Sequence, residues 1–120
     1  MNKRRVGGCK EELAADFLAG QGLRITDRNF RVRQGEIDLV GYDGKTLVFA
    51  EVKYRKTAAC GDPAEAVGIR KQQQICKVAA FYRSFRKLDP STPVRYDVVS
   101  ILGDEVTWIK NAFPERSGGF

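Results

Sequence analysis

Residues 35–55 read Gly-Glu-Ile-Asp-Leu-Val-Gly-Tyr-Asp-Gly-Lys-Thr-Leu-Val-Phe-Ala-Glu-Val-Lys-Tyr-Arg, and this stretch decides the fold. Two segments rich in apolar and β-branched residues flank Asp43-Gly44, a dipeptide typical of a two-residue hairpin loop. The sequence therefore predicts two antiparallel strands, at about 35–41 and 46–54.

The Asp-Gly loop also predicts which residues of the hairpin face each other. With Asp43 and Gly44 as the loop, Glu36 lies opposite Glu51, and Asp38 is opposite Phe49 and diagonal to Glu51. Because side chains alternate between the faces of a strand, one face carries Glu36, Asp38, Glu51 and Lys53 beside Val40, Leu47 and Phe49. The other face carries an apolar set suited to packing: Ile37, Leu39, Val48, Ala50 and Val52.

Carboxylates that face one another repel unless a positive charge lies between them. A divalent cation and Lys53 are two candidates for that charge. A loop of odd length would place Asp38 and Glu51 on opposite faces, so the interpretation depends on the loop. The alternative is an edge hairpin whose polar face meets only water.

The remaining pattern predicts an α/β fold. We expect a helix at about 9–21, a basic strand at 23–33, a loop at 55–63, a long helix at 64–87 and strands at 94–101 and 105–110. The order α-β-β-β-α-β-β is typical of a mixed central sheet flanked by helices. Without repeats or a boundary, residues 1–120 are expected to form a single domain, with a flexible basic arm at 1–8 and a flexible tail at 114–120.

Composition narrows the chemistry. The chain has 120 residues, of which 42% are hydrophobic and 30% charged, and it has no run of about 18 apolar residues, so we expect no membrane span. Its three cysteines lack a Cys-x-x-Cys spacing, which favours reduced thiols in the cytoplasm. Histidine is absent, so any catalysis must use carboxylates, lysine and a metal held by oxygen. The net charge of +6 favours a polyanionic partner such as DNA, RNA or an anionic lipid surface, although many basic domains bind none.

Helical spacing predicts where the charged residues of the long helix lie relative to the sheet. Lys71 falls within the apolar stripe of the long helix, formed by Ile75, Val78, Ala79, Tyr82 and Phe85. Its side chain either faces an anionic centre on the sheet or extends to solvent. No acidic residue occurs between positions 66 and 88, so this helix suits phosphate contacts, unless its charges form only a solvated face.

These residues resemble the PD-(D/E)xK nuclease superfamily, which has a restriction-endonuclease-like fold. They are more closely similar to the YraN-like family of small bacterial proteins, which resembles the archaeal Holliday junction resolvases. The similarity covers most of the chain, through Glu11-x-x-Ala14-x-x-Phe17-Leu18, Asn29-Phe30-Arg31, Gly35-Glu36-Ile37-Asp38-Leu39, Val48-Phe49-Ala50-Glu51-Val52-Lys53-x-Arg55, Lys71, Ala79-Ala80, Arg95-Tyr96-Asp97-Val98-Val99 and Ile109-x-Asn111-Ala112-Phe113. Lys10 stands where the family usually has glycine.

The resemblance implies a Mg²⁺- or Mn²⁺-dependent endonuclease acting on DNA, including branched DNA such as Holliday junctions. Metal carboxylates then fall on Asp38 and Glu51, the catalytic lysine on Lys53 and an auxiliary acid on Glu11. The hairpin geometry adds Glu36 as a further candidate acid. The Val52 carbonyl would complete the metal ligands, and the expected nucleic-acid contacts are Arg31, Arg33, Arg55, Arg70, Lys71 and Lys77. A homodimer is expected by analogy with the two-fold symmetry of junctions. The alternatives are a non-catalytic nucleic-acid-binding domain that retains the fold, and a module that binds an acidic protein.

Overall fold

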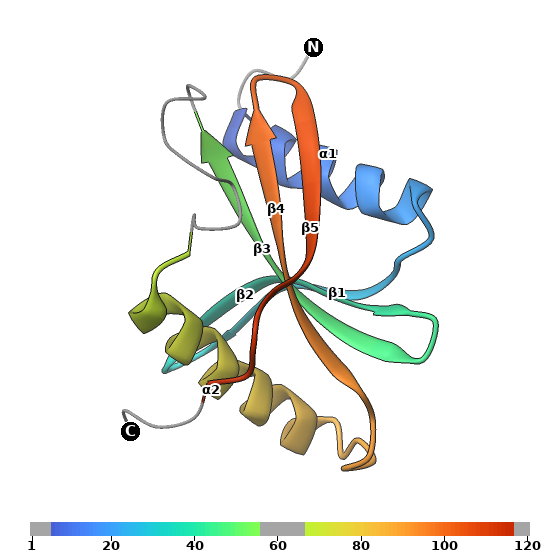
Figure 1. Cartoon of the computed structure of the whole chain (residues 1–120), viewed down its shortest axis with the longest axis vertical. Helices are drawn as coiled ribbons and strands as arrows, with labels where there is room; N and C mark the ends of the chain where they lie inside the picture. The colour runs from blue at the N-terminus through green and yellow to red at the C-terminus, as the bar shows by residue number, and fades with distance from the viewer. Residues whose placement is uncertain (1–5, 56–66, 117–120) are drawn as a thin grey trace.

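A computed structural model describes residues 6–55 and 67–116, with side chains from residue 11 onward (Figure 1). Its elements follow the predicted order. They are α1 (Val6–Gly20), β1 (Arg24–Val32), β2 (Gly35–Asp43), β3 (Thr46–Arg55), α2 (Ile69–Phe85), β4 (Val94–Leu102) and β5 (Glu105–Phe113).

The five strands form one mixed sheet in the order β1-β2-β3-β4-β5. Neighbouring strands are antiparallel except β3 and β4, which are parallel because α2 connects them. The α/β architecture with a mixed sheet between helices, predicted from the sequence, is confirmed.

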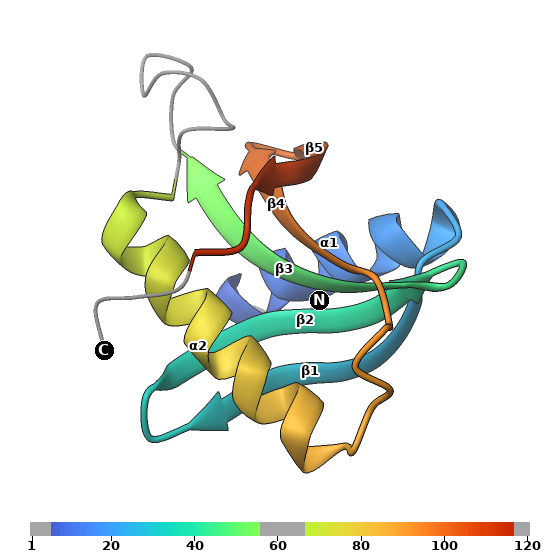
Figure 2. The same ribbon diagram turned by 60° about the horizontal axis from the view of Figure 1, so that its bottom comes forward.

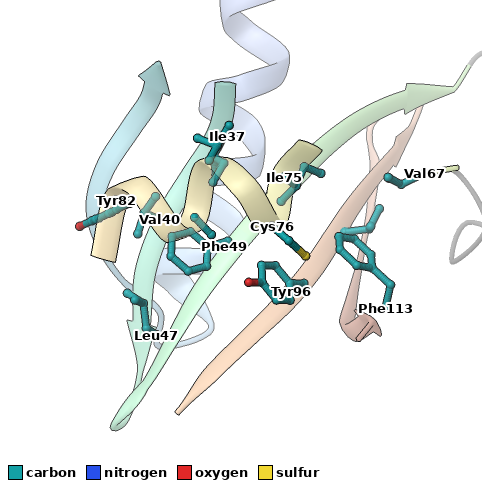
Figure 3. Packing of buried hydrophobic residues seen from close by; sticks show 13 residues of the cluster. Ile37, Val40, Leu47, Phe49, Val67, Ile75, Cys76, Tyr82, Tyr96 and Phe113 are labelled. Atoms are coloured by element: carbon teal, nitrogen blue, oxygen red, sulfur yellow. The ribbon is translucent and has the colours of Figure 1, made fainter. Parts of the chain in front are cut away.

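The two helices cover opposite faces of the sheet (Figure 2). On one face, Ala14 and Leu18 of α1 pack with Leu39, Val48 and other residues of the sheet. On the other, α2 lies over a cluster of mixed aliphatic and aromatic residues, whose arrangement around Phe49 is seen in Figure 3. The Phe49 ring meets Tyr82 edge-on at 5.6 Å and stacks on Tyr96 at 5.8 Å. These contacts fix α2 on the sheet, and with it the residues at its first turn.

The buried face of α2 differs from the predicted stripe at one end. Ile75, Val78, Ala79 and Tyr82 are buried as expected, together with Gln72 and Cys76. Phe85, however, is 70% exposed, so its predicted burial is wrong. The reason is that Phe85 lies by the edge strand β1, where the sheet ends, with its ring 6.4 Å from that of Phe30.

Parts of the predicted flexible arm and tail belong to the described structure. Helix α1 begins at Val6, so only residues 1–5 of the predicted arm lie outside the described chain. In the predicted tail, residues 114–116 are packed: the Arg116 main-chain nitrogen donates to Cys76 Sγ at 3.3 Å, and Tyr96 Oη donates to Glu115 at 3.3 Å. Residues 117–120, and the predicted loop and helix start at 56–66, lie outside the described residues.

Two expectations from composition can be compared with the described residues. The Cys76 thiol is buried and forms no disulfide, and burial raises its pKa. Within residues 6–55 and 67–116, no helix has the length and apolarity needed to cross a bilayer.

Candidate active site at the fork between two strands

The hairpin loop consists of Gly44 and Lys45, one residue later than predicted. Asp43 pairs with Thr46, and Leu39 pairs with Ala50, so the predicted pairing of Val40 with Leu47 is wrong by two residues. Asp43 stays in the strand because its carboxylate is 3.0 Å from Arg95 Nη2 and 3.8 Å from Lys110 Nζ. Gly44 supplies the positive φ, +63°, that the first loop position favours.

This shift changes the partners of the acidic residues but keeps the parity of the register. The described pairing of β2 with β3 ends at Leu39 and Ala50, and beyond that point the strands diverge (Figures 1 and 2). We call this point the strand fork. Asp38 on β2 and Glu51 on β3 are the residues that directly follow the last pair, one on each strand. They were predicted to be diagonal neighbours. The observed register, continued by one residue beyond its last pair, places them opposite each other instead.

The Asp38 carboxylate lies between the diverging strands. Its Oδ2 accepts a hydrogen bond of 2.8 Å from the main-chain nitrogen of Val52. The carboxylate thus replaces the main-chain acceptor that the Val52 N–H group lacks where the strand pairing ends. The bond also holds Asp38 beside Glu51, the residue before Val52.

The alternation of side chains along β2 is broken at Asp38. Leu39 packs on the α1 side as predicted, but Ile37 packs on the α2 side with Val40, so the predicted face of Ile37 is wrong. Across on β1, Asn29 lies between the residues that pair with Leu39 and Ile37, and its φ of +54° bends that strand. Asparagine tolerates this left-handed conformation better than most residues.

As a consequence, Asp38 is within the electrostatic reach of both helices. Burial raises its pKa most strongly, and the negative charges of Glu11 on α1 and of Glu36 raise the pKa further. The Val52 hydrogen bond and the positive charge of Lys71 on α2 act in the opposite direction.

Glu51 is the most strongly perturbed acid of the site. Burial and, after it, the negative charge of Asp38 raise its pKa to about 7, from an ordinary value of 4.5. Only 8% of the residue is exposed. Two neighbouring carboxylates that resist ionising together provide a place where an added cation is strongly favoured.

Two lysines face this pair of acids. Lys71 Nζ lies 3.8 Å from Glu51 Oε2, so of the two orientations considered from the sequence, its side chain takes the one toward the sheet. Lys53, two residues along β3 from Glu51, is half-buried, and its charge lowers the pKa of Glu51. Neither lysine cancels the raised pKa, because the burial and Asp38 contributions are larger.

The two other acids differ in their relation to the pair. Glu11 is half-buried on α1 and acts on Asp38 through its charge. Glu36 was predicted to lie opposite Glu51, which the register contradicts. It accepts instead a 3.3 Å hydrogen bond from Arg31 of the neighbouring strand β1.

The predicted phosphate-contact residues lie around the fork and along α2. Arg55 is half-buried at the end of β3, Arg70 is exposed in the first turn of α2, and Lys77 lies about two turns further along the helix. Arg33 is exposed in the turn after β1. That turn is held to α2, because Gln74 Nε2 donates to the Gln34 carbonyl at 2.8 Å.

Gln72 is a positioning residue that the sequence interpretation missed. It is buried, donates to the Val67 carbonyl at 2.8 Å and accepts a hydrogen bond from Arg116 Nε. These bonds fix the first turn of α2. They therefore also fix the position of Lys71, which directly precedes Gln72 in the sequence. Its place three residues before Ile75 and four before Cys76 is the helical spacing that predicts a shared buried face.

The donor atoms of the fork fit a small, hard cation. Across the described chain, no three His, Cys, Asp or Glu side chains converge well enough to hold a metal alone. Asp38 and Glu51 supply two carboxylates, and the Val52 carbonyl, predicted as a third oxygen ligand, belongs to the residue after Glu51. Mg²⁺ accepts such sets, since it is usually bound through one or two carboxylates and keeps several waters.

Comparison with known proteins places the chain in a family. The sequence profile described as "Uncharacterised protein family UPF0102" matches residues 10–101, a range that contains Glu11, Asp38, Glu51, Lys53 and Lys71. The chain belongs to this family. The resemblance to the YraN-like proteins is thereby confirmed.

Relatives match over nearly their whole length. A UPF0102 protein of Lachnoclostridium phytofermentans is 48% identical over 113 residues, covering 94% of this chain and 96% of its own. One from Colwellia psychrerythraea is 46% identical, covering 89% and 87%. One from Symbiobacterium thermophilum is 46% identical over 98 residues, covering 82% of each chain. Their names give the family and no activity.

Proposed function

We propose that the protein is a Mg²⁺- or Mn²⁺-dependent endonuclease that hydrolyses phosphodiester bonds in DNA, including branched DNA such as Holliday junctions. The observation that carries the proposal is the meeting of Asp38 and Glu51 at the strand fork, with Lys53 and Lys71 beside them. Reduced thiols and DNA as substrate suit a cytoplasmic protein.

In this proposal, Asp38, Glu51 and the Val52 carbonyl would hold the metal ion. The bound ion supplies Lewis-acid activation of the scissile phosphate and lowers the pKa of a coordinated water. Asp38 is held in place for this role by the Val52 N–H group. Glu51 must lose its proton to become a ligand, so its raised pKa makes metal affinity depend on pH around neutrality.

The lysines would act on the charge that develops at the phosphate. Lys53, carried by β3 two residues after Glu51, would orient the attacking water or stabilise the transition-state oxygens. Lys71 presently interacts with Glu51, and a phosphate at the fork offers its ammonium group a second anionic partner. The first turn of α2 also contains no acid, so the positive end of the helix adds to the attraction.

Binding of DNA would rest on the basic residues around the fork. Arg33, Arg70 and Lys77 lie along one side, on α2 and on the turn that Gln74 ties to it, and Arg55 lies at the end of β3. Such contacts are independent of sequence and weaken as salt rises. A homodimer, which we propose for junction substrates, would present two such surfaces related by a two-fold axis.

The proposal is tested by incubating the protein with duplex, single-stranded and four-way-junction DNA in Mg²⁺ or Mn²⁺. The wild-type protein is compared with Asp38→Ala, Lys53→Ala and, as a matched control, the exposed lysine variant Lys45→Ala. We expect cleavage by the wild type and by Lys45→Ala, and loss of about a hundredfold or more in the other two. Equal cleavage by all four would indicate a contaminant.

The same assay addresses the alternatives. Salt-sensitive binding of DNA without cleavage would favour a non-catalytic nucleic-acid-binding domain. Absence of DNA binding altogether would favour a module for acidic proteins.

A further inference from the structure

Two large aromatic side chains of α2 are exposed next to each other. Phe81 is 42% exposed and Phe85 70% exposed. Residues four apart lie on the same side of a helix. With Phe30, Arg31 and Val32 of β1 they line a pocket of about 230 Å³. None of the residues that line this pocket is a proposed metal ligand or one of the two lysines beside the ligands.

Basic side chains border this aromatic pocket. Arg31 lines it, and the Arg86 guanidinium lies over the Phe85 ring at 5.5 Å from its centre. The two nearby acids, Asp27 and Glu36, form ion pairs with these same arginines. Helix α2 contributes no carboxylate at any position, and Lys87 follows directly after Arg86.

Exposed aromatic rings beside basic side chains favour some ligands of this pocket over others. A second copy of the chain, with its net charge of +6, would bring two basic surfaces together. An unpaired nucleobase has a flat apolar face for the phenyl rings, and its phosphates carry the opposite charge. Aromatic side chains set in a basic groove are the usual platform for single-stranded nucleic acid.

We infer that the Phe30–Phe81–Phe85 pocket binds an unpaired base of a single-stranded DNA segment. The inference rests on the proposed function and names the kind of substrate more closely: DNA with an unpaired stretch beside the cleaved bond. Phe85 follows Lys71 by 85 − 71 = 14 residues, which is about 21 Å along α2 and about 40° around its axis. That length corresponds to about six nucleotides at the spacing of a stacked strand.

The test measures fluorescence anisotropy of a labelled fifteen-nucleotide oligothymidine and of a fifteen-base-pair duplex, with the full chain in EDTA. The variant Phe81→Leu/Phe85→Leu keeps the apolar character but removes both flat rings. The control is Ile69→Ala, which trims another exposed apolar residue of α2, 52% exposed. We expect the double variant to bind the single strand at least fivefold more weakly, with duplex affinity changed by less than about twofold. The control should leave both affinities unchanged.

Three results would overturn the inference: unchanged single-strand affinity in the double variant, an equal loss for duplex and single strand, or dissociation of a homodimer by the same substitutions. This result can be told apart from the test of the proposed function. If the wild type cleaves DNA but the double variant binds the single strand equally well, only base binding by the pocket is rejected. If binding depends on the two rings but the protein does not cleave DNA, only the nuclease activity is rejected.

Discussion

The Asp38 carboxylate accepts a 2.8 Å hydrogen bond from the main-chain nitrogen of Val52, across the point where β2 and β3 separate. This hydrogen bond gives the Val52 N–H group an acceptor where the pairing of the two strands ends. It also holds the Asp38 carboxylate beside Glu51, the other proposed metal ligand. It also defines how substitutions at Asp38 should behave.

Asp38→Asn should separate stability from activity. The amide oxygen can still accept from Val52 N–H, while the charge that repels Glu51 is gone, so we expect the metal-free protein at pH 8 to be at least as stable as the wild type. Cleavage should fall by about a hundredfold or more, since a metal ligand loses its charge. Asp38→Ala, which leaves the Val52 N–H group without this acceptor, should be less stable by about 1–3 kcal/mol in urea unfolding.

The metal-free protein should lose stability as pH rises through neutrality. The folded-state pKa of Glu51 is raised to about 7 from 4.5, so between these values the folded state binds more protons than the unfolded state. The free energy of unfolding should therefore fall from pH 5 to pH 8, by at most about 3 kcal/mol from this group. The raised pKa of Asp38 acts in the same direction.

Urea unfolding at several pH values in EDTA measures this effect, with Glu51→Gln as the comparison. The glutamine cannot ionise, so the slope between pH 5 and 8 should flatten. A wild-type stability that instead rises over this range would show that the two carboxylates are not crowded as described.

Lys71 should influence the titration of Glu51 more than the stability of the fold. Its ammonium group, at 3.8 Å, lowers the pKa of Glu51, and its side chain is 39% exposed. In Lys71→Met we expect the pKa of Glu51 to rise further, moving the pH dependence of Mn²⁺ binding upward. Carbon-detected NMR titration of the carboxylates measures this directly, and Lys77→Met is a matched control on the same helix. An unchanged titration in Lys71→Met would contradict the contact.

Asp97 should be a stability residue without a part in the chemistry. It is fully buried, forms two 2.9 Å bonds to Arg95, and accepts from Trp108 Nε1 and the Asn111 main-chain nitrogen at 2.8 Å. Asp97→Ala leaves the Arg95 charge without this partner, so unfolding should become easier by about 3–5 kcal/mol. Trp108 fluorescence during urea unfolding reports the change, and metal affinity of the folded fraction should stay the same.

Local pattern was enough to predict the order of elements and the meeting of Asp38 with Glu51. The errors arose where residues far away in the sequence determine the local structure. The loop moved by one residue because Arg95 and Lys110, far along the chain, hold Asp43 in its strand. Ile37 packs on the face opposite to the predicted one, across from the point where Asn29 of β1 adopts a positive φ.

The misplacement of Phe85 has a similar origin. Helical periodicity puts it on the apolar stripe, but periodicity does not say where the sheet beneath the helix ends. Its exposure at the edge strand, beside Phe30, is the feature from which the base-binding pocket was inferred. The raised pKa of Glu51 likewise depends on burial that only the packed helices create.

The central claim is that Asp38 and Glu51 form a metal-dependent phosphodiesterase site. Its most direct test is the single-turnover rate of cleavage of a labelled four-way junction against Mn²⁺ concentration at pH 8, for wild type and Glu51→Gln. We predict a rate that saturates with Mn²⁺ in the wild type, and in Glu51→Gln a rate at least about a hundredfold lower with DNA binding retained. Equal rates for the two proteins, or a wild-type rate independent of Mn²⁺, would contradict the account.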